Sequence, residues 1–117
     1  MTAPLTSALP GVSRHRDGRC LTVALRGEID LSTIDAVKSA LTAALTDAGD
    51  ATLAVDLREL TFMDSSGLHA LCALRERAMH CGNRLVLVRG PRQIHRIFEL
   101  TATDGLFEFV DDPASVA

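Results

Sequence analysis

The sequence predicts a single α/β domain built around a small mixed β-sheet. Short apolar segments alternate along the chain with longer segments in which apolar residues recur every three or four positions, the spacing of one helix face. The first two predicted strands are joined by Asp17-Gly18, which is typical of a hairpin turn. The 117 residues suffice for one hydrophobic core and contain no internal repeat. The predicted order of elements is therefore ββαβαβαβ.

The first half of the chain predicts a hairpin followed by a helix. The strands of the hairpin are residues 12–16 and 20–26, and Gly27-Glu28-Ile29-Asp30 ends the second strand. Ser32 is a good N-cap for the helix, with Asp35 three positions later in a near capping box, and Gly49 ends the helix. The apolar face of this helix, which we expect in the core, consists of Ala36, Val37, Ala40, Leu41, Ala44, Leu45 and Ala48.

The second half predicts two further strand–helix pairs and a final strand. Residues 53–57 and 85–88 are apolar strands, residues 66–80 form a helix that ends at Gly82, and Gly90-Pro91 begins a third helix. The predicted apolar face of the second helix contains Leu68, Leu71, Cys72, Met79 and the aliphatic part of Arg75, and that of the third contains Ile94, Ile97, Phe98 and Thr101. Residues 106–110 form the last strand, and residues 111–117 form a tail or a marginal helix.

The composition argues against several classes of partner. A net charge of −3 disfavours nucleic acid, and four Phe without Trp or Tyr offer no platform for stacking single-stranded bases. Cys20, Cys72 and Cys81 form an odd set without the spacing of a disulfide framework, so we expect reduced thiols. No apolar run is long enough to cross a membrane, and the first ten residues lack the features of a signal peptide. We therefore expect a cytoplasmic protein that binds neither nucleic acid nor membrane, with a flexible tail at residues 1–11 and one domain at residues 12–117.

The most informative motif is Asp64-Ser65-Ser66-Gly67, which lies between a predicted strand and a predicted helix. The first turn of a helix presents N–H groups without intrahelical partners and the positive end of the helix dipole. Two hydroxyls beside a carboxylate at such a position are typical of a functional site. The motif is also compatible with a simple N-cap and tight turn, because Ser and Asp are favoured there for local hydrogen bonding alone. Gly67 is expected to be structural in either case, since it gives the helix room to cross the sheet.

This motif and its surroundings resemble the signature of bacterial anti-sigma factor antagonists, the stand-alone STAS domains of partner-switching pathways. Three further segments are similar to that family: Gly27-Glu28-Ile29-Asp30, Val55-Asp56-Leu57 and Ile97-Phe98-Glu99-Leu100-Thr101. The resemblance runs from about Val12 to Val110. It implies a small sheet with helices packed mainly on one face, and a regulatory binding protein rather than an enzyme. We expect no cofactor and no bound metal.

The resemblance also implies a phosphorylation switch. In this family the unphosphorylated antagonist binds an anti-sigma factor, which releases a sigma factor. The anti-sigma factor is itself a serine kinase that uses ATP, and a separate serine phosphatase reverses the modification. Ser65 is the implied phosphoacceptor, with Ser66 as the less favoured position. The residues expected to bind the partner are Glu28, Asp30, Asp64, Ser66, Gly67 and His69.

The sequence departs from the family pattern at three places. His69 lies where small or aliphatic residues are common, and it could alter which kinase recognises the site. Ala102 replaces a glycine that is common after the third helix, and the N-terminal tail is longer than in minimal members. None of these departures removes the implied phosphoacceptor.

Two other functions remain open. In an enzyme, Ser65 or Ser66 would be the nucleophile, although the sequence lacks a Gly-x-Ser-x-Gly elbow and a histidine placed by motif as its base. The chain would otherwise be a constitutive STAS subunit of a transport or sensory complex that is not phosphorylated.

Two clusters of polar residues invite further interpretations. His69, Cys72, His80 and Cys81 share one predicted helix, but a metal site needs ligands that converge from other segments, and the sequence has no Cys-x-x-Cys. Arg89, Arg92 and Arg96 form a modest basic patch after the 85–88 strand. This patch is either a solvated face or a contact for a nucleotide or a kinase.

Overall fold

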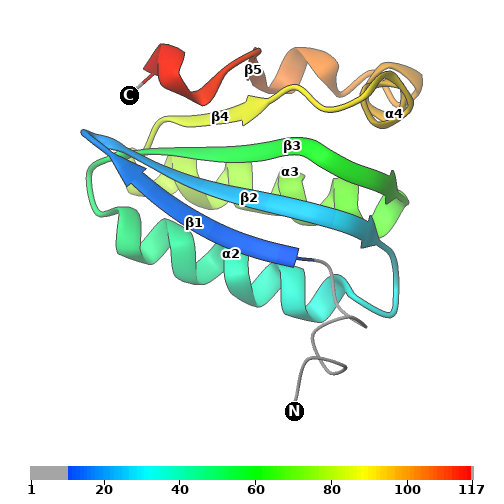
Figure 1. Ribbon diagram of the computed structural model, residues 1–117, viewed down its shortest axis with the longest axis horizontal. Helices are drawn as coiled ribbons and strands as arrows, with labels where there is room; N and C mark the ends of the chain where they lie inside the picture. Colours follow the sequence, from blue (N-terminus) through cyan, green and yellow to red (C-terminus); the bar gives the residue numbers. More distant parts are fainter. Residues whose placement is uncertain (1–10, 117) are drawn as a thin grey trace.

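The computed structural model describes residues 11–116, which form a five-stranded sheet with three α-helices (Figure 1). The strands are β1 (Gly11–Asp17), β2 (Cys20–Ile29), β3 (Thr52–Met63), β4 (Leu85–Val88) and β5 (Glu108–Val110). The helices are α2 (Ile34–Ala48), α3 (Ser65–Cys81) and α4 (Arg92–Leu100), and the short 3-10 helices are η1 (Asp104–Leu106) and η2 (Pro113–Val116). The predicted order ββαβαβαβ is confirmed.

The strands lie in the sheet in the order in which they occur in the chain. β1 pairs antiparallel with β2, and each later pair is parallel, so the predicted mixed sheet is confirmed. Each parallel connection passes through a helix. The carboxyl ends of β2, β3 and β4 therefore lead into the N-termini of α2, α3 and α4, and two of these junctions form the candidate site.

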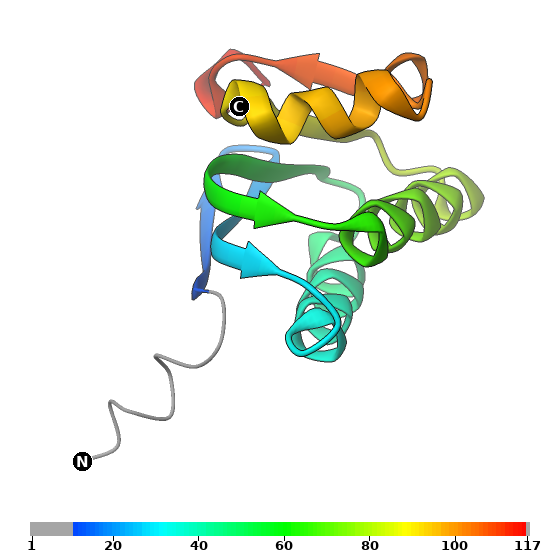
Figure 2. The same ribbon diagram turned by 90° about the vertical axis from the view of Figure 1, so that its right-hand side faces the viewer.

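The main hydrophobic core lies between the sheet and its helices. Figure 2 shows α2 and α3 on the same side of the sheet, as the predicted one-sided arrangement requires. Leu25 of β2, Leu57 of β3 and Leu71 of α3 are buried there, and α4 adds Ile94 and Phe98. The opposite face carries a smaller apolar cluster of Cys20, Ala54 and Val86, against which Val116 of η2 packs.

The strands β2 and β3 are longer than the sequence predicts. They were expected to end at residues 26 and 57, but they remain paired beyond a bulge as far as Ile29 and Met63. Exposed polar residues in this extension resemble turn residues in the sequence. Leu60 and Met63 are nevertheless buried, because one side of the extension faces the core. The extension places the ends of β2 and β3 side by side at the candidate site.

The start and the buried face of the helices differ from the prediction at four residues. One is Thr101, which is exposed and follows the end of α4 as its C-cap instead of lining the buried face. Thr33, not Ser32, is the N-cap of α2, because the Ser32 amide and hydroxyl both donate hydrogen bonds to Asp30. Ala36 is exposed, so it is not part of the buried face of α2. Met79 is 62% exposed near the end of α3, where it lines a surface hollow with Leu85 and Leu106 instead of being buried in the core.

The C-terminal ends of the helices follow the predicted glycines. Gly49 and Gly82 end α2 and α3, and both have positive φ angles, which glycine adopts without strain. Ala102, which stands where the family commonly has a glycine, also has a positive φ, of 58°. The last strand begins at Glu108 rather than at residue 106, since the preceding residues form η1.

The two ends of the chain are only partly described. The predicted tail at residues 1–11 lies, apart from Gly11, outside the described residues, and Gly11 is the first residue of β1. Of the two alternatives for the C-terminal segment, the short helix is observed, as η2. Between residues 11 and 116, no helix combines the length and the apolar character needed to cross a membrane.

Candidate functional site

The candidate site lies where β2 and β3 end side by side. Ile29 and Met63 are paired in the parallel register, and the Asp64 amide donates a hydrogen bond of 3.1 Å to the Ile29 carbonyl. Asp30 and Asp64 each follow directly after one of these strands. The turn from β2 to α2 and the turn from β3 to α3 are therefore neighbours, which brings together two motifs that are 34 residues apart in the sequence.

Both turns are built in the same way, on an aspartate and a serine two positions later. Oδ1 of Asp64 accepts hydrogen bonds from the Ser66 amide, at 2.9 Å, and from the Ser66 hydroxyl. Oδ1 of Asp30 accepts the Ser32 amide at 2.9 Å and the Ser32 hydroxyl at 2.6 Å. Such local bonds from backbone and side chain to aspartate are the usual means of fixing a turn.

The carboxylate of Asp30 is stabilised in its ionised form. The hydroxyl of Ser32 is the main cause, and the Ser32 amide, the Thr33 amide and the Thr33 hydroxyl add to it, so the pKa of Asp30 lies below its ordinary value. Burial opposes the shift without reversing it. Asp30 thus keeps its negative charge over the whole physiological pH range.

The structure distinguishes the two serines of the motif. Ser65 is the first residue of α3 and is exposed, and its hydroxyl makes no hydrogen bond with any residue from 11 to 116. Ser66 is partly buried, and its hydroxyl donates to Asp64. The resemblance to the family favoured Ser65 by its position in the motif, but the residue types alone do not separate two adjacent serines.

The backbone around Ser65 is suited to a negative charge. Asp64 is the N-cap of α3, and its carbonyl accepts the amides of Gly67 and Leu68 at 3.1 and 3.3 Å. The Ser65 amide has no partner among residues 11–116. An N–H group without a partner at the positive end of a helix dipole stabilises an anion.

Gly67 is buried under the first turn of α3, which agrees with its predicted structural role. A Cβ atom at this position would lie 2.5 Å from Cγ of Met63 and 3.0 Å from Cγ2 of Ile29. Only glycine therefore allows α3 to start this close to the ends of β2 and β3. Because Gly67 is buried, any part it has in binding a partner would be indirect.

The remaining predicted partner-binding residues, Glu28 and His69, are exposed. Glu28 is paired in the sheet with Phe62, which is 47% exposed, and Leu31 in the neighbouring turn is 80% exposed. Neither apolar residue was predicted for the site. Leu31 could have been noticed, since it is a large apolar residue between two polar turn residues. The exposure of Phe62 depends on the unpredicted extension of β3.

The other polar residues singled out in the sequence lie along α3 and after β4. Cys72 is partly buried, and burial raises the pKa of its thiol, whereas His69, His80 and Cys81 are exposed. Residues 11–116 contain no group of three His, Cys, Asp or Glu residues arranged to hold a metal ion.

The predicted basic patch is partly neutralised. Arg89 forms an ion pair of 3.1 Å with Asp111, and its guanidinium lies 5.2 Å from the centre of the Phe109 ring. Arg92 and Arg96 are exposed on α4.

Comparison with known proteins identifies the family. The family model described as "Mlab, STAS domain" matches residues 12–110, the same segment that forms the sheet and its helices. The chain belongs to the STAS domain family. This STAS domain is 30% identical over 95 residues to the anti-sigma-B factor antagonists of Listeria monocytogenes and Listeria innocua. In each case the match covers 81% of this chain and 82% of the relative.

Solved structures agree with this assignment. An anti-sigma factor antagonist from Mycobacterium paratuberculosis has a TM-score of 0.80 at 25% identity, over 91% of this chain and 92% of that chain. The antagonist SpoIIAA in its unphosphorylated form has a TM-score of 0.73 over 91% of this chain and 93% of that chain. At 17% identity, that second likeness supports the fold alone. The predicted resemblance to STAS-domain antagonists is confirmed.

Proposed function

We propose that this STAS domain is an anti-sigma factor antagonist whose unphosphorylated form binds an anti-sigma factor, and that phosphorylation of Ser65 ends the binding. The observation that carries the proposal is the difference between the two serines. The Ser65 hydroxyl is exposed at the start of α3 without a hydrogen-bond partner among residues 11–116, whereas the Ser66 hydroxyl is bound to Asp64. The 30% identity to proteins named as anti-sigma-B factor antagonists supports the class of partner.

The partner that fits this proposal is an anti-sigma factor that is also a serine kinase. Binding of the antagonist would release a sigma factor and so change transcription, for example in a stress response. Phosphate transfer from ATP to Ser65 would end the complex, and a serine phosphatase would restore the binding form. The cycle would take place in the cytoplasm and would require neither nucleic acid nor membrane contact by this domain.

The proposed phosphate would act on docking rather than on folding. A phosphoserine adds about 1.5–2 negative charges near neutral pH. The N-terminus of α3 tolerates such a charge, because its dipole and the unpartnered Ser65 amide favour anions. Asp64 and Asp30 already place negative charge in the two adjoining turns. An acidic partner surface would therefore be repelled, and an apolar one would have to bury the charge without water. A coupling of about 1–3 kcal/mol changes affinity by roughly 5- to 150-fold.

The direct test combines phosphorylation with binding. The purified protein is incubated with the candidate anti-sigma kinase and ATP, and the modified residue is located by mass spectrometry. We expect phosphate on Ser65 in the wild type and in Ser66→Ala, and none in Ser65→Ala. With ATP present, Ser65→Ala should stay bound to the kinase while the wild type dissociates. Modification at other residues, or no modification at all, would contradict the proposal.

The same purified protein and variants distinguish this proposal from the other two classes of function. Labelling of Ser65 by an activity-based serine probe would favour an enzyme, although no hydrogen bond within residues 11–116 joins a histidine to Ser65 or Ser66. If Ser65→Ala and wild type behave alike in the presence of kinase and ATP, the domain is a constitutive STAS subunit of a larger complex.

A further inference from the structure

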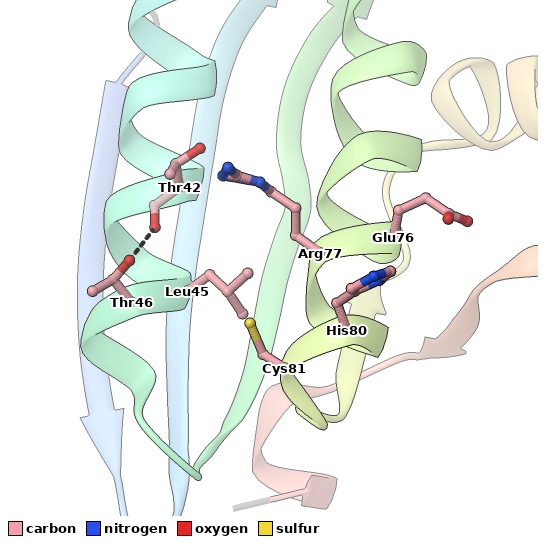
Figure 3. Close-up of a pocket in the computed structure, with 7 residues that line it drawn as sticks. All are labelled: Thr42, Leu45, Thr46, Glu76, Arg77, His80 and Cys81. Atoms are coloured by element: carbon pink, nitrogen blue, oxygen red, sulfur yellow. Dashed lines mark hydrogen bonds between the residues drawn. The ribbon is translucent and has the colours of Figure 1, made fainter.

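A groove separates α2 from α3 on the outer surface of the domain. A cavity of about 440 Å³ lies between the C-terminal halves of the two helices (Figure 3), and its walls include Leu45 and Thr46 from α2 and Cys81 from α3. A second cavity of about 180 Å³ extends along the same two helices toward Lys38. Thr42 and Arg77 line both cavities, so the two adjoin each other along the groove between the helices. The larger volume is within the usual range for small-molecule sites.

The interior of the groove is mostly apolar. Leu41 and Leu74 line the smaller cavity, and Leu45 lines the larger one. These leucines belong to the main core, but their outer edges form part of the groove wall. Figure 3 shows Leu45 and Cys81 facing each other from the two helices. An apolar chain lying there would be shielded from water on two sides.

Positive charge is concentrated around Arg77. Figure 3 shows the Arg77 side chain reaching from α3 toward Thr42 of α2, at the point where the two cavities meet. Lys38 lines the smaller cavity beside it. Neither cation takes part in any ion pair among residues 11–116. The acidic residue of the lining, Glu76, is paired with Arg75 at 3.4 Å. The groove therefore combines an apolar channel with two cations, Lys38 toward one end and Arg77 where the two cavities adjoin.

We propose that this groove binds a single-chain amphiphile with an anionic head, such as a medium-chain fatty acid. The carboxylate lies between Lys38 and Arg77, and the acyl chain extends toward Leu45 and Cys81. Leu45 lies seven positions after Lys38, roughly 10 Å farther along α2, a length that the chain of a medium fatty acid covers. The charged groups make carboxylates preferable to alcohols or cations of equal chain length.

This site is distinct from the turns that carry Ser65. Arg77 is 12 residues beyond Ser65 on the same helix, about 18 Å along the axis at 1.5 Å per residue. The residues that line the two cavities include none from either turn, and the nearest of them on α3 is Ala70, five residues beyond Ser65. The inference therefore does not depend on the proposed function, and its test uses neither kinase nor anti-sigma factor.

Cys81 provides a reporter for occupancy of the groove. It is exposed and lines the larger cavity, whereas Cys72 is partly buried elsewhere on α3 and Cys20 is buried in the sheet. The full chain is treated with iodoacetamide at increasing concentrations of laurate, kept below the concentration at which laurate forms micelles, and alkylation of each cysteine is followed by mass spectrometry. We expect laurate to slow alkylation of Cys81 in a saturable manner and to leave Cys72 unchanged. The absence of saturable protection would overturn the proposal.

Variants and matched ligands test the assigned head-group position. Arg77→Gln removes an exposed side chain without ion-pair partners in the described part of the chain, so the fold is retained, and we expect laurate affinity to fall roughly five- to tenfold. Arg96→Gln, an exposed arginine of α4, is the matched control and should change affinity less than about twofold. Acetate and dodecyltrimethylammonium should protect Cys81 weakly or not at all. Equal protection by the cationic amphiphile, or equal effects of the two arginine variants, would refute the anionic specificity.

Discussion

Gly67 offers a test of how the sheet fixes the start of α3, and thereby the position of Ser65. The substitution Gly67→Ala adds a Cβ atom 2.5 Å from Cγ of Met63 and 3.0 Å from Cγ2 of Ile29. Met63 and Ile29 are each 1% exposed, so neither side chain can move into solvent to make room. The backbone of α3 must shift away from the strand ends, or the packing beneath it must rearrange.

The expected cost follows from two opposing effects. Overpacking a well-filled core costs about 1–3 kcal/mol. Alanine favours a helix over glycine by about 0.8–1.0 kcal/mol in a helix interior, and Gly67 lies in the first turn, where this gain is smaller. We therefore expect the free energy of unfolding to fall by about 1–2 kcal/mol, which corresponds to a Tm lower by roughly 4–8 °C for a domain of this size.

The measurement is guanidinium unfolding followed by circular dichroism. Gly105→Ala is the matched control, because a Cβ atom there has no neighbour within 4 Å, and its unfolding free energy should stay within about 0.5 kcal/mol of the wild type. Met63→Ala removes the contacted side chain. Combined with Gly67→Ala, it should cost about 1 kcal/mol less than the sum of the single changes. A Gly67→Ala protein as stable as the wild type, or strict additivity with Met63→Ala, would refute the reasoning.

Four further predictions concern the caps, the switch and the charges. Asp64→Ala removes the side-chain cap of α3 and should lower the unfolding free energy by about 1 kcal/mol in a denaturant titration; equal loss in Asp64→Asn, which still accepts the Ser66 amide, would contradict the cap. Protein phosphorylated at Ser65 should melt within about 2 °C of the unmodified form by scanning calorimetry. A large drop in Tm would contradict the proposal that the phosphate acts on docking and not on folding. The Arg84 side chain lowers the pKa of Glu108. The pair therefore stabilises the fold above the unfolded pKa of Glu108, and this stabilisation is lost as the pH falls through the lower, folded pKa. Glu108→Gln should make the free energy of unfolding depend less on pH on the acid side, and the effect should be modest because both side chains are about half exposed. Ala102→Gly should raise the unfolding free energy by about 1 kcal/mol, since Ala102 has a φ of 58°, and a loss of stability would show that its methyl group packs usefully.

The order and type of the elements could be predicted because local signals and tertiary structure agree in this chain. Gly49 and Gly82 end helices where the sequence predicts, and the apolar residues 85–88 form a buried strand. The lengths of β2 and β3 could not be predicted in this way. Their last residues are held by pairing with each other, a contact between segments that is absent from the pattern of either segment alone.

The place of the motif in the fold was predicted, but the geometry around it was not. Asp64-Ser65-Ser66-Gly67 was expected at a strand-to-helix turn and lies at one. The sequence did not show that Ser32 binds Asp30 instead of capping α2, because both arrangements satisfy the same local preferences. The choice depends on Thr33, whose hydroxyl reaches the Glu28 carbonyl at 3.1 Å, and this contact exists only once β2 has extended to Ile29.

The common construction of the two turns gives a physical reason for placing a switch here. In each turn the residue between the aspartate and the serine is exposed, and it is Leu31 in one turn and Ser65 in the other. A partner that covers both turns gains free energy by removing Leu31 from water and tolerates a neutral hydroxyl at Ser65. The same removal of water would make a phosphate at Ser65 costly, because the Ser65 amide and the dipole of α3 would replace only part of the hydration that its charge loses. In the proposed switch, the apolar contact that favours docking would thus also make docking sensitive to the modification, while the hydrogen bonds that hold both turns would stay in place.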